Sequence, residues 1–142
     1  MAFMKLLITI AFYLIPVLCQ SQLSYDNEVL GTWVGDIYGG GLPKKSIKIV
    51  MSKSNYKEGG GACQGYSLVN NSNKTSFSGT VIVEADMPII EVYEPKTNPK
   101  NGKFYLLVGC FENDEIITDL CCGTWTSYDG KIMRKIRVKK IE

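Results

Sequence analysis

The chain has 142 residues, of which 45% are hydrophobic and 21% are charged, and its formal net charge at pH 7 is +2. This length predicts one domain, and the small net charge gives no electrostatic reason to expect nucleic acid as a partner. The sequence contains no histidine, which excludes Ser-His and Cys-His catalytic pairs.

Motifs of other enzyme classes are also missing. There is no Gly-x-Ser-x-Gly, phosphate-loop or dinucleotide fingerprint, so we expect no enzyme, no catalytic residue and no cofactor. Only carboxylate chemistry stays open, through acids scattered along the chain, which are normally solvated at strand ends. These acids are Asp36, Glu91, Glu94 and Asp119.

The first residues have the pattern of an export leader. Lys5 precedes an apolar run from Leu6 to Leu18 that is too short to span a bilayer. We therefore expect residues 1–19 to be a secretory signal peptide and residues 20–142 to form a single domain, secreted or periplasmic. A lipid anchor on Cys19 is the alternative, although Leu18 precedes it where such sites favour a small residue. No later stretch is long and apolar enough to predict a transmembrane helix.

Apolar and β-branched runs recur about every dozen residues through the mature chain, without a sustained helical period. They predict eight strands, at residues 29–38, 46–52, 62–69, 77–85, 89–94, 103–111, 115–126 and 131–141. Asn101-Gly102 and Asp129-Gly130 are the strongest signals for tight hairpin turns. Short connections pair neighbouring strands in order, and closure leaves no unpaired edge, which predicts an all-β, eight-stranded antiparallel up-and-down barrel. A two-sheet sandwich is the alternative.

The two ends of the domain carry related features. The tripeptide Gly-Thr-Trp occurs at residues 31–33 and again at 123–125. In the last strand, alternation places Arg134 on the inner face together with Ile136 and Val138. A buried guanidinium needs a partner. If the barrel closes, the first strand lies beside the last one, so we expect Arg134 to pack against the ring of Trp33.

These residues carry a resemblance to a known family. Gly31-Thr32-Trp33 resembles the Gly-x-Trp signature in the first strand of lipocalins and their calycin relatives, and Arg134 resembles the last-strand arginine that packs across that tryptophan. The mature length is more similar to avidin-type barrels, but the several tryptophans that enclose biotin are missing. The resemblance, which extends to exported lipocalin-like bacterial proteins, implies a calycin-type barrel closed by Gly31, Trp33 and Arg134.

Four cysteines remain after the expected leader: Cys63, Cys110, Cys121 and Cys122. A bridge between the neighbours Cys121 and Cys122 would be strained, and in a strand their side chains point to opposite faces. Two outcomes stay open: two bridges, or one bridge plus two buried thiols. Without histidine or a Cys-x-x-Cys spacing, we expect no metal site.

Two functions fit such a barrel. The first, which the resemblance favours, is an exported binding protein that holds a small apolar ligand, with Trp125, Phe104 and Tyr66 as ligand-binding residues. The second is a protein-binding module, such as an exported inhibitor or immunity-type factor, with a filled barrel and contact loops at residues 39–45, 53–61 and 96–102. A cavity of a few hundred Å³ that reaches solvent would favour the first function.

Overall fold

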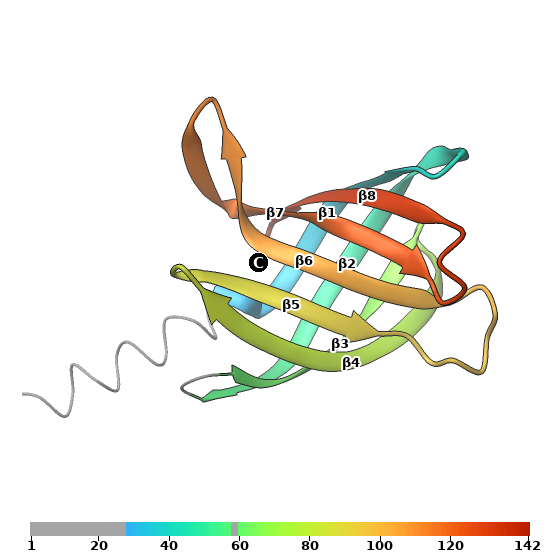
Figure 1. The fold of residues 1–142 in the computed structure, drawn as a ribbon, viewed down its shortest axis with the longest axis horizontal. Helices are drawn as coiled ribbons and strands as arrows, with labels where there is room; N and C mark the ends of the chain where they lie inside the picture. Colours follow the sequence, from blue (N-terminus) through green and yellow to red (C-terminus); the bar gives the residue numbers. More distant parts are fainter. Residues whose placement is uncertain (1–27, 58–59) are drawn as a thin grey trace, which may run out of the picture.

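The chain folds as a closed antiparallel β-barrel (Figure 1). The computed structural model describes residues 28–57 and 60–142, so the expected leader at residues 1–19 lies outside the described residues. The strands are β1 (Gly31–Gly39), β2 (Leu42–Lys57), β3 (Gly60–Val69), β4 (Ser72–Glu84), β5 (Met87–Tyr93), β6 (Gly102–Glu112), β7 (Glu115–Ser127) and β8 (Met133–Lys140). Each pairs with the next, and β8 pairs with β1. The predicted eight-stranded barrel is confirmed.

Four of the connections are two-residue turns in which both central residues have positive φ. They lie between β1 and β2 (Gly40-Gly41), β3 and β4 (Asn70-Asn71), β4 and β5 (Ala85-Asp86), and β6 and β7 (Asn113-Asp114). Positive φ at both positions matches the right-handed twist of the flanking strands. Glycine and asparagine tolerate this conformation best, which explains three of the four turns.

The prediction of tight two-residue turns at Asn101-Gly102 and Asp129-Gly130 is wrong. Gly102 begins β6, after a long connection at residues 94–101, and residue 101 does not have a positive φ. Between β7 and β8, Gly130 has a φ of 72°, but Asp129 keeps a negative φ in a wider loop. Asp129 accepts hydrogen bonds from the Ser127 hydroxyl at 2.7 Å and from the Lys131 backbone at 3.0 Å, which holds the wider loop together.

The barrel closes between its first and last strands. Trp33 lies opposite Lys140 and Ile37 opposite Ile136, and the Ile141 backbone N–H donates to Thr32 at 2.9 Å just beyond the strand end. A Cβ on Gly31 would lie 1.9 Å from the carbonyl oxygen of Glu142, and Gly31 has a φ of 126°. Glycine at this position therefore allows the end of the chain to approach β1.

One end of the barrel is filled with side chains, and we call it the sealed end. Trp33 is buried there, and its Nε1 donates a hydrogen bond to the carbonyl of Val29 at 3.1 Å. The ammonium of Lys140 lies 5.5 Å from the centroid of the Trp33 ring. Other inward side chains complete this half of the core: Ile49, Met51, Cys63, Val81, Ile90, Val108, Cys121 and Val138.

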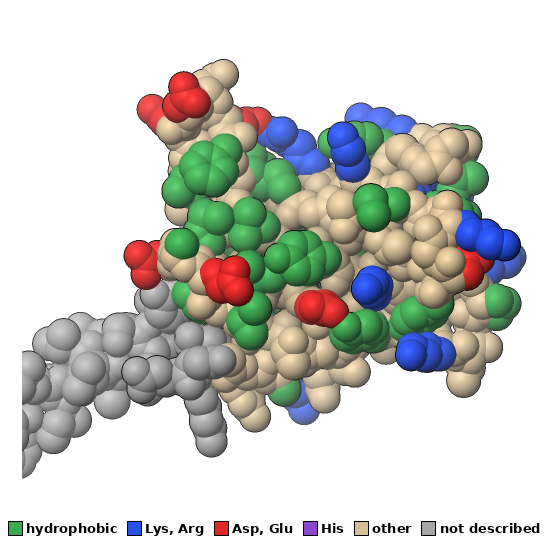
Figure 2. Space-filling view, viewed as in Figure 1, with side chains coloured by type: hydrophobic (Ala, Val, Ile, Leu, Met, Phe, Trp, Pro, Cys, Tyr) green, Lys and Arg blue, Asp and Glu red, His purple; other side chains and the backbone are tan. Residues whose placement is uncertain are grey.

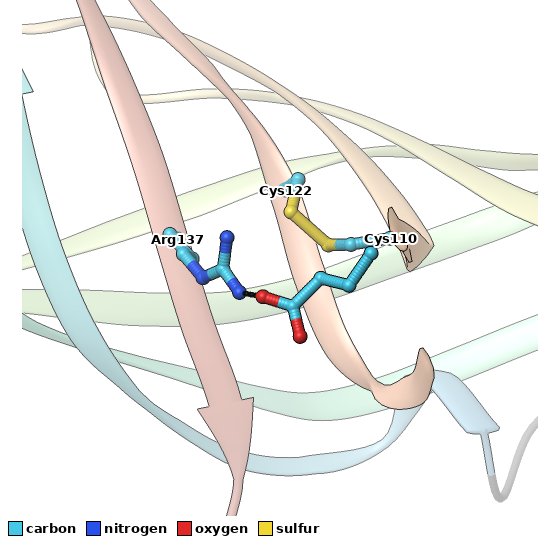
Figure 3. Close-up of a disulfide and its surroundings, with 4 residues drawn as sticks. Cys110, Cys122 and Arg137 are labelled. Carbon is cyan, nitrogen blue, oxygen red and sulfur yellow. Dashed lines mark ion pairs between the residues drawn. A yellow bond between two sulfur atoms is a disulfide. The ribbon is translucent and has the colours of Figure 1, made fainter. Parts of the chain in front are cut away.

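The disulfide joins β6 to β7. Gly109, with a φ of 99°, interrupts the register after the Val108–Cys121 pair, so that Cys110 reaches across to Cys122 on the outside of the barrel (Figure 3). Cys63 and Cys121 remain as buried thiols. Of the two outcomes that the sequence left open, one bridge plus two buried thiols is the one observed.

Within residues 28–57 and 60–142, no helix has both the length and the apolar character needed to cross a membrane.

Candidate functional site

A cavity of about 790 Å³ occupies the other end of the barrel, which we call the open end. It lies inside the strands, between the β1–β2 turn and the connections that lead into β6 and β8. Its lining includes the exposed residues Leu42, Lys45 and Lys100, so the cavity reaches solvent. The apolar part of the wall consists of Ile37, Leu42, Ile47, Val69, Pro99, Phe104, Trp125 and Ile132.

The cavity exists because several inward side chains at the open end are small. Ser67 in β3 and Thr75 in β4 are register partners, and both line the cavity. At the sealed end, the inward positions hold larger side chains such as Met51 and Val81. Phe104 forms the floor between the two halves and lies 5.9 Å from the ring centroid of Phe77. The same alternation of inward residues therefore fills one half of the barrel and leaves the other half hollow.

Glu94 places a carboxylate in the cavity wall, and its residue is only 7% exposed. Its Oε2 accepts hydrogen bonds from the Gly102 backbone at 2.8 Å and from Trp125 Nε1 at 3.1 Å. Its Oε1 accepts only a long bond of 3.4 Å from the Ser67 hydroxyl. No ion pair among the described residues includes Glu94. Because Oε1 accepts only this one long bond, it can accept a further hydrogen bond.

Arg134 is the basic group in the wall and is 5% exposed. Its Nη2 donates to the carbonyls of Pro43 at 2.6 Å and Ile37 at 3.1 Å, and its Nε donates to Gly39 at 3.3 Å. These bonds attach the β1–β2 turn to β8. The expected packing of Arg134 against Trp33 is corrected by the register, since Arg134 lies opposite Trp125 and the cation over Trp33 is Lys140.

The rim of the cavity is mostly basic. Lys45, Lys74 and Lys100 lie there, together with the carboxylate of Asp129. The hydrogen bond from Ser127, followed by that from the Lys131 backbone, lowers the pKa of Asp129. The mouth of the cavity therefore offers the exposed ammonium groups of Lys45 and Lys100 to an incoming molecule, whereas that of Lys74 lies over the ring of Tyr66.

The structure brings together two of the three predicted ligand-binding residues. Trp125 and Phe104 both line the cavity. Tyr66 lies on the outer face of β3, where the Lys74 ammonium is 4.2 Å from its ring centroid, and it borders a separate outer groove of about 570 Å³. Strand alternation explains the difference, because Tyr66 precedes the inward-facing Ser67. Of the closure residues, Gly31 and Trp33 lie at the sealed end and Arg134 at the open end.

Sequence reasoning missed Glu94 and Ser67 as wall residues. The signal was present for Glu94, since it follows Ile90 and Val92 at the spacing of one strand face. The other acids considered for catalysis lie elsewhere: Asp36 pairs with Lys44 at 2.8 Å, Asp119 pairs with Lys139 at 3.4 Å, and Glu91 accepts a hydrogen bond from Tyr93. In the described part of the chain, no three His, Cys, Asp or Glu side chains are grouped as a metal site requires.

Comparisons with known proteins inform the fold alone. No family model matches the chain, and no curated protein sequence matches it. Among solved structures, a redesigned β-barrel is similar, with a TM-score of 0.55 and 11% identity over 82% of this chain and 94% of that chain. At this level of identity, the likeness supports the barrel architecture and says nothing about activity.

Proposed function

We propose that this protein is an exported small β-barrel that holds a small, mostly apolar molecule in the open half of the barrel. The observation that carries the proposal is the cavity of about 790 Å³, lined by Phe104 and Trp125 and open to solvent. Its volume lies within the range of typical small-molecule sites, roughly 300 to 1,000 Å³. The alternative of a protein-binding module assumes a filled barrel, and the cavity therefore favours the carrier.

The wall also suggests which molecule fits. Apolar side chains such as Phe104 and Trp125 form one part of it and polar side chains form the rest, so burial of the apolar part of a ligand contributes to the affinity. Glu94 Oε1 would accept a hydrogen bond from a ligand donor, and the lysines of the rim would attract an anionic or polar group at the mouth. We therefore expect an amphipathic ligand of modest size, with a hydrogen-bond donor on the part that reaches Glu94.

Export and kinship with calycins belong to the same proposal. Export has two supports: the leader pattern of residues 1–19, and the Cys110–Cys122 disulfide, because disulfides persist in oxidising compartments. The calycin relationship is supported by the closed up-and-down barrel and by Gly31 and Trp33 at the start of β1.

The two tryptophans of the chain allow a direct test, because Trp125 lines the cavity and Trp33 is buried at the sealed end. The neutral apolar dye N-phenyl-naphthylamine is titrated into the Trp33→Phe and Trp125→Phe variants. We expect the dye to quench Trp125 strongly and Trp33 weakly. Native mass spectrometry of the exported protein would show any co-purified small molecule.

A blocked cavity provides the matched control. Val69→Phe adds bulk inside the cavity, and Ile82→Phe adds the same group at an exposed position of β4. The first variant is expected to lose dye binding and the second to keep it. Equal quenching of both tryptophans, or unchanged binding by Val69→Phe, would contradict the proposal.

A further inference from the structure

The end of β6 and the start of β7 form a hairpin that projects beyond the barrel (Figure 1, orange). Pairing between β5 and β6 ends at Leu107, and pairing between β7 and β8 begins at Leu120. Residues 109–112 and 115–119 therefore pair only with each other across the Asn113-Asp114 turn. Among the described residues, no strand occupies the outer edge of β7 at residues 115–119, which leaves backbone donors and acceptors there for another strand.

The hairpin exposes large apolar side chains. Phe111 and Ile116 are register partners on one of its faces, and they are 67% and 48% exposed. Figure 2 shows hydrophobic side chains gathered over this side of the molecule, from the hairpin onto the barrel wall. An aromatic and a branched side chain placed opposite each other would normally be covered, so this pair marks a surface suited to a partner.

All charged residues of the hairpin are acidic. Residues 109–120 include Glu112, Asp114, Glu115 and Asp119 and contain neither lysine nor arginine. Glu112 pairs with Arg137, and Asp119 pairs with Lys139. Asp114 and Glu115 take part in none of the described ion pairs, and acidic side chains are visible at the tip in Figure 2. Their carboxylates are complementary to a basic partner.

Two contacts brace the hairpin, one at its base and one from the residue beside its turn. The Cys110–Cys122 disulfide ties β6 to β7, and beside it the guanidinium of Arg137 in β8 forms its ion pair with Glu112 (Figure 3). An isolated two-stranded hairpin is only marginally stable in water. Bracing keeps the projecting strands in place, so a partner would not have to order them on binding.

We propose that this hairpin is a docking site for an extended, basic segment of another protein. The segment adds as a strand along the outer edge of β7 at residues 115–119, with apolar side chains against Phe111 and Ile116 and basic ones facing Asp114 and Glu115. A second copy of this chain is a poorer match, because its basic strand β8 is already paired on both sides within the closed barrel. The site lies at the sealed end of the barrel and is independent of the cavity.

A peptide pair tests the proposal on the full chain. The probe is a short fluorescent peptide of alternating lysine and valine, and its matched partner replaces each lysine with glutamate. Fluorescence anisotropy should detect binding of the lysine peptide at low salt and none of the glutamate peptide. A probe with alternate backbone nitrogens methylated keeps the side chains but loses the strand donors, and its binding should be lost.

Variants then locate the site. The double change Asp114→Lys and Glu115→Lys should weaken binding of the lysine peptide about tenfold or more, and Phe111→Ser should weaken it as well. Met133→Ser is the control, because Met133 is 60% exposed on β8, away from the hairpin. Near-UV circular dichroism confirms that each variant is folded.

Three results would overturn the proposal. The first is lysine-peptide binding that the double charge change leaves intact, and the second is full binding by the methylated probe. The third is concentration-dependent self-association in sedimentation that Phe111→Ser abolishes, since this would make a second copy the occupant.

Discussion

The indole Nε1 of Trp125 donates a hydrogen bond of 3.1 Å to Oε2 of Glu94 inside the cavity. The bond joins a residue near the end of β7 to the residue that follows β5, and the Gly102 backbone donates to the same oxygen at 2.8 Å. Trp125 has Arg134 as its register partner on β8. The indole of the wall is thus anchored through its Nε1, so a ligand would not have to order it on binding.

Replacing Glu94 with Gln tests this arrangement. A glutamine has a single acceptor oxygen, so one of the three donors at this position would face an NH₂ group or lose its partner. We expect the free energy of unfolding to fall by about 1 to 3 kcal/mol, as measured by urea unfolding. Glu91→Gln is the matched control, because the Glu91 side chain lies on the opposite face of β5, and it should change stability little. An equal loss in both variants would mean that the Glu94 contacts are not special.

The sealed end makes a prediction about Trp33 and Lys140. Trp33→Ala removes a buried ring from the core and should lower stability by about 3 to 5 kcal/mol. Lys140→Met keeps most of the side-chain length but removes the cation that lies 5.5 Å from the ring centroid, and its cost should be about 1 kcal/mol or less. Thermal or urea unfolding measures both. A near-neutral Trp33→Ala would show that the sealed end does not depend on the indole.

Reduction of the disulfide should loosen the hairpin before the barrel. Cys110 and Cys122 are separated by 12 residues, and a loop of this size predicts a stabilisation of about 2 to 3 kcal/mol from the restricted unfolded chain. In the double variant Cys110→Ser and Cys122→Ser, hydrogen exchange should accelerate most at residues 109–120. Uniform acceleration over all eight strands would instead assign the disulfide to the whole barrel.

The two buried thiols predict a loss of stability at high pH. Burial raises the pKa of Cys63 to about 11 and that of Cys121 to about 12, from 9.0. Above the value of 9.0 that applies to the unfolded chain, the unfolded state loses these protons while the folded state keeps them. The contribution of the two thiols to the free energy of unfolding is therefore fully present below about pH 9. It is lost as the pH rises toward their pKa values in the folded state, by up to about 1.4 kcal/mol per pH unit for each thiol.

Urea unfolding at a series of pH values measures this slope. Lysine and tyrosine side chains also titrate in this range, so the informative quantity is the difference between the wild-type chain and Cys121→Ala. The variant should show a shallower decline with pH. Identical slopes would show that Cys121 does not titrate differently in the two states.

The sequence was sufficient to predict the strands, their order and the closure of the barrel. Period-two alternation is a local property, and it correctly placed Arg134, Ile136 and Val138 on the inner face. Register is not local, however. Closure could be inferred, but which residue of β8 lies beside Trp33 depends on how far the strands slide relative to one another, and Lys140 takes that position.

The cavity and the hairpin were harder to predict for different reasons. The space at the open end results from small inward residues on neighbouring strands, such as Ser67 and Thr75, which come together only when the register is known. Tyr66 was placed in the cavity without its face being assigned. The projection of the hairpin follows from the interruption at Gly109, from the start of β5 at Met87 and from the end of β8 at Lys140, and none of these has a distinct pattern in the sequence.

The meeting of β1 and β8 has a practical consequence for orientation. Thr32 and Glu142 are joined by a backbone hydrogen bond of 3.0 Å at the sealed end, so a fusion partner, label or surface tether attached to either terminus of the barrel leaves from that side. A barrel immobilised in this way would point the mouth of its cavity outward into the medium, where diffusing molecules can enter it freely.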